Sequence, residues 1–222
     1  MNNILSQKEK KIIFNDWRSN LKVYTPNKPM HLLKRNGPIL TGIYFRIVYG
    51  KQHYSPEFHT HSLFCSFPVI TSTSTVQLKN NKGAIESFSF FEHEKNFDSI
   101  IERFKGMSQI ISEGEISCSQ LIEIYEHAFH NPCATPYQFQ LLMDHVLVLW
   151  WCEKFELAEE KLEQYKPIIK KWELEGVNIK YNDWLSKIES LMNKNIMEKI
   201  IEEEVNKFKL IELKDYGLIC DG

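Results

Sequence analysis

The first half of the chain alternates short hydrophobic runs with turn signals, a pattern typical of β-strands. The run ILTGIYFRIVY is rich in β-branched and aromatic residues and ends at Gly50, so it predicts a strand. A strong turn signal, Asn80-Asn81-Lys82-Gly83, separates two later runs. The predicted strands cover residues 38–49, 58–67, 69–78 and 84–91. Their connections are too short for crossover helices, so we expect a mainly antiparallel meander of about four strands.

A short amphipathic helix is predicted ahead of these strands, over residues 6–23. Its apolar positions share one broad face: Ile12, Ile13, Trp17 and Leu21. Residues 24–30 contain Pro26 and Pro29, and such prolines favour an extended connection between elements. The helix needs a cover for its apolar face, and the sheet that follows can supply it.

After His93 the hydrophobic spacing changes to that of α-helices. Ser117 is followed by Gln120 at the spacing of a capping box, which marks the start of one helix. The predicted helices cover residues 95–111, 117–130, 137–153, 156–172, 178–193 and 196–210. The third is apolar on nearly all sides, so we expect it to be the most buried, and it forms an αα-hairpin with the fourth.

These elements predict an α+β fold in which strands and helices are segregated along the chain. The β-rich part covers residues 1–94 and the helical part covers residues 95–222. The two parts can still form one continuous domain, because the first helix of the helical part follows directly from the last strand and can pack on the sheet. Phe208, Leu210, Ile211 and Leu213 can dock the last residues of the chain.

Composition places the chain among ordinary globular proteins. It has 222 residues, of which 43% are hydrophobic and 25% charged. The most apolar run, Val146 to Trp151, is far shorter than the roughly 20 residues that span a membrane. Five cysteines form no CxxC pair, so we expect reduced thiols and a cytoplasmic protein with no membrane partner.

Charge is distributed unevenly along the chain. Residues 1–82 contain 12 Lys and Arg against 3 acidic residues, which gives +9, and the remaining 15 basic and 26 acidic residues give −11. Such asymmetry has two explanations: a basic surface that binds an acidic partner, or attraction between the two halves within the fold.

A histidine-rich segment offers the one local cluster with possible chemistry. His59 and His61 alternate along a predicted strand, so they share a face and could ligate a metal, with His53 nearby. Cys65, Leu63 and Phe67 belong to the same face, which also fits the core side of a sheet. We therefore favour structural histidines, and keep a metal-dependent enzyme or metal-binding protein as the alternative.

Motifs of enzymes and cofactor sites are missing from the sequence. Neither a phosphate-binding loop nor a Gly-x-Ser-x-Gly elbow occurs, so we expect no cofactor and, on balance, no enzyme. The basic half offers Lys34, Arg35 and Arg46 as candidate partner-binding residues. Nucleic acid is a minor hypothesis for their partner, because the acidic half would repel a long polyanion.

The leading hypothesis is a non-enzymatic protein-protein interaction module. Helical hairpins, uneven charge and the lack of a catalytic motif all agree with this function. Bacterial immunity and antitoxin proteins, which cover a toxin, share this character. The partner is then another protein.

Overall fold

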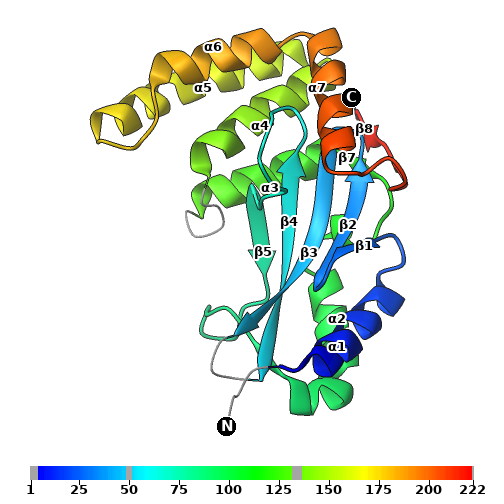
Figure 1. Ribbon diagram of the computed structural model, residues 1–222. Helices are drawn as coiled ribbons and strands as arrows, with labels where there is room; N and C mark the ends of the chain where they lie inside the picture. Colours follow the sequence, from blue (N-terminus) through cyan, green and yellow to red (C-terminus); the bar gives the residue numbers. More distant parts are fainter. Residues whose placement is uncertain (1–4, 49–51, 132–136, 222) are drawn as a thin grey trace.

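The computed structural model describes residues 5–48, 52–131 and 137–221. It confirms the α+β fold: an N-terminal helix, an antiparallel meander and a helical C-terminal region (Figure 1). The main sheet has the order β1-β2-β3-β4-β5, and β6 pairs with the far end of β4. Its strands are β1 (Thr25–Lys28), β2 (His31–Asn36), β3 (Ile39–Val48), β4 (His53–Ser62), β5 (Ser74–Gln77) and β6 (Phe88–Ser89).

The hairpin of β1 and β2 lies where an extended connection was expected. Pro26 is tolerated because β1 is an edge strand, which needs donors only on one side. Met30 closes the turn with a left-handed backbone, φ 61°, a conformation that an apolar residue rarely signals in a sequence. β4 also begins earlier than expected, because its polar first half is buried.

Helices α1 and α2 lie at one end of the sheet, and the remaining helices gather at the other (Figure 1). The capping boxes of α1 (Ser6 with Glu9) and α3 (Ser117 with Gln120) are both formed. As expected, α4 is buried along most of its length. The helices are α1 (Gln7–Asn20), α2 (His93–Lys105), α3 (Cys118–His130), α4 (Gln138–Trp151), α5 (Phe155–Leu174), α6 (Tyr181–Leu191) and α7 (Lys194–Lys207), with short 3-10 turns at Phe90–Glu92 and Gln109–Ile111.

Trp17 of α1 is the centre of the core on one face of the sheet. Its ring lies 5.2 Å from that of Phe45 and 5.0 Å from that of Phe104. The indole donates to the hydroxyl of Tyr54 at 3.3 Å, and this hydroxyl lies 2.7 Å from Nδ1 of His93. Since these polar atoms satisfy one another, the network is a stable part of the core.

The C-terminal segment returns to the sheet. Its short strand β8 (Leu218–Ile219) pairs in parallel with β7 (Ile116–Ser117). Asp215 forms an ion pair with Arg35 at 3.3 Å and accepts a hydrogen bond from the backbone of Gly37. These contacts order the end of the chain.

A disulfide joins Cys152 to Cys220, 68 residues further along the chain, with their Cα atoms 4.9 Å apart. The expectation that all cysteines are reduced is therefore wrong for these two, since the returning segment brings Cys220 beside the end of α4. Cys65 and Cys118 are free and buried, and Cys133 lies outside the described residues. Because disulfides are rare in the cytoplasm, the cysteines no longer support a cytoplasmic location.

Among the helices that the described residues form, none combines the length and the apolar character that a membrane crossing requires.

Candidate functional site

His59 of β4 lies against His31 of β2, across the intervening strand β3. Their Nε2 atoms are 2.9 Å apart, and both side chains are fully buried. The ring of Tyr44 stacks on His31 at 3.9 Å. Gly42 makes the arrangement possible, because a Cβ there would come within 2.3 Å of His59 Nε2. The pair therefore depends on a glycine that the strand pattern does not single out.

Both imidazoles of this pair are neutral. Burial, and then the nearby charge of Lys28, lower the pKa of His31 to about 3. Burial lowers the pKa of His59 well below its ordinary value, and His31 and His61 lower it further. The amide nitrogen of Asn27 donates to Nδ1 of His31 at 3.3 Å, so His31 carries its proton on Nε2 and donates to His59.

The histidines predicted as metal ligands have different polar partners. His61 lies 3.2 Å from the hydroxyl of Thr71, and its ring contacts those of Phe67 and Phe208. His53 lies at the opposite end of β4 and contacts Ser87. In the described ranges no group of three or more His, Cys, Asp or Glu side chains is arranged to hold a metal ion. The arrangement here is a buried hydrogen-bonded pair, His31 with His59.

The three basic residues predicted to bind a partner have different surroundings. Lys34 is fully buried, and its ammonium donates to the backbone carbonyls of Ile110, at 3.0 Å, and Glu113. Arg35 is bound to Asp215, and the exposed Arg46 to Glu57 of the same sheet face. Lys34 therefore has no surface from which to reach a partner, and the other two cations already have carboxylate partners.

Asp144 of α4 is a buried acid that sequence reasoning missed, since it stood out only as an interruption of an apolar run. Its Oδ1 accepts a hydrogen bond of 2.7 Å from Gln140, whose amide also contacts Cys65 at 3.7 Å. Burial raises the pKa of Asp144 to about 7, and burial first of all raises that of the Cys65 thiol to about 11. A neutral thiol is a poor nucleophile, so this cluster is part of the packing.

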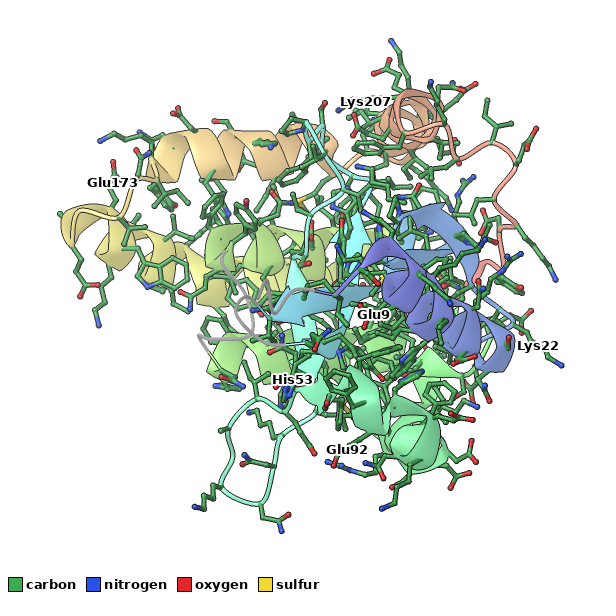
Figure 2. All side chains as sticks on the ribbon, turned by 60° about the horizontal axis from the view of Figure 1, so that its bottom comes forward. Glu9, Lys22, His53, Glu92, Glu173 and Lys207 are labelled. Carbon is green, nitrogen blue, oxygen red and sulfur yellow. A yellow bond between two sulfur atoms is a disulfide. The ribbon has the colours of Figure 1, made fainter. Side chains whose placement is uncertain are left out.

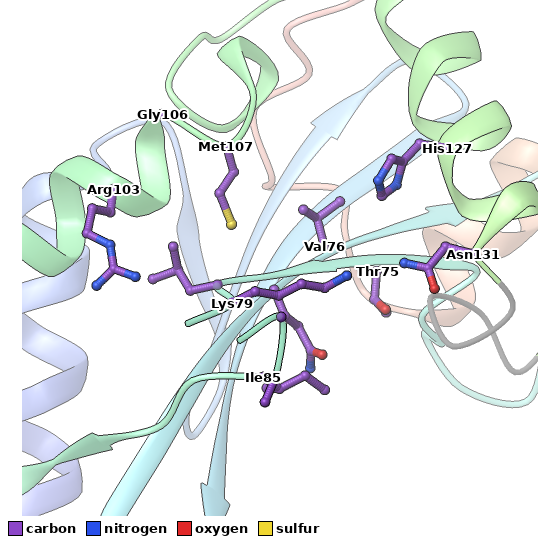
Figure 3. A pocket seen from close by; sticks show the side chains of 13 residues that line it. Thr75, Val76, Lys79, Ile85, Arg103, Gly106, Met107, His127 and Asn131 are labelled. Atoms are coloured by element: carbon purple, nitrogen blue, oxygen red, sulfur yellow. The ribbon is translucent and has the colours of Figure 1, made fainter. Parts of the chain in front are cut away.

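A groove of about 820 Å³ runs beside the edge strand β5, between the end of α2 and the end of α3 (Figure 3). Val76 of β5 and Met107, which follows α2, point into it, and His127 of α3 faces them. Ile85 lines the same groove from the hairpin that follows β5 and is 53% exposed. The volume lies in the range of ligand sites, but the groove is long and open to solvent.

The described lining of the groove holds few titratable side chains. No serine or cysteine lines its described walls. Arg103 is at one end, but two of its nitrogens are bonded to Glu86. His127 is at the other end, on α3.

A second hollow shares Arg103 with the groove and extends it past Phe91, which is 74% exposed. A third shares Val76, Met107 and His127 and extends it along α3. Sequence reasoning missed these residues because they come from three distant segments; the hairpin signal after β5 was the one available clue.

Comparison of the chain with protein-family models, with curated proteins and with solved structures found no match.

Proposed function

We propose that the protein is a non-enzymatic protein-protein interaction module that receives a segment of its partner in the groove beside β5. The observation that carries this proposal is the groove itself, with Val76, Ile85 and Met107 as its apolar contacts. A toxin, covered in the manner of an immunity or antitoxin protein, is one kind of partner within this proposal.

The shape of the groove suits an extended or helical segment. It lies along a sheet edge and continues at both ends into further hollows, so a chain several residues long can follow it. Exposed apolar side chains at its rim, Ile85 and Phe91, would lose contact with water on binding. Burial of such anchors supplies most of the affinity of a typical protein interface.

The test is capture of the partner by tagged full-length protein, comparing wild type with Ile85→Asp. Because Ile85 is 53% exposed, the substitution leaves the core intact but puts a charge in the groove. We expect a stoichiometric protein companion with wild type, and its loss with Ile85→Asp.

Leu174→Asp is the matched control, because Leu174 is an equally apolar and 88% exposed residue at the end of α5, away from the groove. It should retain the companion. A companion retained by Ile85→Asp would contradict the groove as the interface. A protein recovered without a companion but with stoichiometric metal would contradict the function itself.

A further inference from the structure

A small cleft separates α1 from the turn between β1 and β2. Its volume is about 310 Å³, and it is lined by Phe14, Pro29 and Met30 together with Gln7, Lys10 and Lys11. The ring of Phe14 lies edge-on to Phe45 at 6.1 Å, which fixes one wall to the core. The cleft thus has an apolar interior and two ammonium groups at its rim.

The backbone of the turn holds the opposite wall in place. Met30 has a left-handed conformation, φ 61°, which is unfavourable for a residue with a long side chain. Its carbonyl accepts a 3.0 Å hydrogen bond from the backbone of Phe45. The sheet therefore stabilises a strained turn that presents an apolar side chain to the cleft.

Six cations lie on α1 and in the segment after it, and five of them are exposed. Two of the six, Lys10 and Lys11, line the cleft. None of the six has a carboxylate within ion-pair distance among residues 5–48, 52–131 and 137–221. They are Lys8, Lys10, Lys11, Arg18, Lys22 and Lys28. Figure 2 shows Lys22 projecting from the end of α1.

The two acidic residues of α1 offset only part of this charge, because two carboxylates stand against six cations and, within the described residues, neither forms an ion pair with a lysine or arginine. Glu9 accepts hydrogen bonds from the backbone of Ser6 in the capping box and from Gln52. Asp16 lies 3.1 Å from Nε2 of His93.

The acidic second half of the chain does not neutralise them either. Of the ion pairs in the described part of the protein, one joins a cation of residues 1–82 to an acid of the later segment, and it is Arg35 with Asp215. Attraction between the halves thus leaves the charge of α1 uncompensated.

We infer that this surface binds an acidic segment of a partner protein, with one apolar side chain of that segment seated between Phe14 and Met30. Lysines at the rim match carboxylates on either side of the anchor, and charge complementarity of this kind selects the partner. A nucleic acid fits less well, because its phosphates would leave the apolar cleft empty and residues 83–222 carry a net charge of −11. The inference does not depend on the groove beside β5.

The experiment is fluorescence anisotropy of the full-length protein with a short labelled peptide, one central leucine flanked by glutamates. Lys10→Glu with Lys11→Glu should weaken binding about tenfold or more, because two attractive contacts become repulsive. Affinity should also fall with added salt. The matched control is Lys95→Glu with Lys199→Glu, two exposed cations of the second half without ion pairs, which should bind as wild type does.

Two further measurements separate the apolar contact from charge. Met30→Asn removes the apolar wall but suits a left-handed backbone, so the protein should keep its fold and lose affinity. Replacing the central leucine of the peptide with glycine should weaken binding to wild type but not to Met30→Asn. Equal binding by wild type and the Lys10/Lys11 variant, or no binding at low salt, would overturn the inference. Tighter binding of a DNA oligonucleotide than of the peptide would assign the surface to nucleic acid instead.

Discussion

Helix α1 and the helices α5 to α7 are both rich in lysine, yet their lysines have different surroundings. Six lysines of residues 155–207 form ion pairs: Lys161, Lys166, Lys171, Lys180, Lys194 and Lys207. The cations of α1 form none within the described residues. Counting charge along the chain does not reveal this difference, because it depends on which carboxylates lie within reach.

The number of lysines in a region therefore does not show how many of them are free to bind an acidic partner. Six of the nine lysines of residues 155–207 already have a carboxylate partner, so these helices have less charge to offer an acidic partner than their lysine count suggests. The α1 surface has two acids, Glu9 and Asp16, and within the described residues neither pairs with a lysine or arginine. Three changes sharpen or break this comparison, from the largest expected effect to the smallest.

Lys34→Ala tests the one lysine that the fold encloses among the described residues of the first half. Its ammonium holds the carbonyls of Ile110 and Glu113 against β2, so truncation leaves two acceptors unpaired and opens a cavity. We expect a loss of about 3 to 5 kcal/mol in the free energy of unfolding, measured by urea denaturation.

Lys22→Ala is the control for this change, because Lys22 is an exposed cation of the same half. It should alter the free energy of unfolding by less than about 0.5 kcal/mol. Similar losses for the two variants would mean that the surroundings of a lysine in this half do not decide its role, and the comparison would fail.

Asp144→Asn tests a carboxyl group of the helical half that has no cation within ion-pair distance in the described part of the chain. The pKa of Asp144 is raised by burial from 3.8 to about 7, so between these values the folded state holds a proton that the unfolded state has lost. Wild type therefore loses stability as pH rises through this window. The amide that replaces the carboxyl group cannot ionise, and its oxygen can still accept from Gln140.

We expect the free energy of unfolding of Asp144→Asn, relative to that of wild type, to rise by about 2 to 3 kcal/mol between pH 5 and pH 8. The measurement is urea denaturation of both proteins at each pH, where other titrating groups cancel in the difference. A constant difference across this range would show that Asp144 ionises normally, and that a carboxylate of the helical half tolerates burial without a cation.

The sequence predicted the elements that are marked by hydrophobic residues and missed those that are marked by polar ones. Strand β3 and helix α4 followed from continuous hydrophobic runs, and the cap of α3 followed from Ser117 and Gln120. The hairpin of β1 and β2 was not predicted, because Pro26 favours an extended connection and the sequence gives no sign of the left-handed backbone at Met30. The early start of β4 was hidden because buried positions in its first half are polar, Ser55 and Glu57 among them.

The candidate surfaces were harder to predict than the elements, because they join distant segments. The groove needs β5, the end of α2 and His127 of α3 in one place, and only the folded chain brings these together. Lys34 and Arg35 are neighbours in the sequence, yet one is enclosed and the other is paired with Asp215. A charge count could find the basic half but could not show that α1 carries its available charge.

The smallest effect is also the most direct test of the comparison, and it uses one lysine from each region. Lys161 of α5 lies 2.9 Å from Glu126 of α3, so Lys161→Gln should cost about 0.3 to 0.5 kcal/mol in roughly 50 mM salt and almost nothing in roughly 1 M salt. Lys11→Gln removes a cation that has no carboxylate and several like charges nearby, so it should be neutral or slightly stabilising. Urea denaturation at both salt concentrations measures the two effects, and a double-mutant cycle with Glu126→Gln isolates the ion pair. Lys11→Gln could instead lower the free energy of unfolding as much as Lys161→Gln does, with the loss disappearing in high salt. In that case Lys11 would have an acidic partner within the protein in solution. The positive charge of α1 would then be no more available to another protein than that of the C-terminal helices.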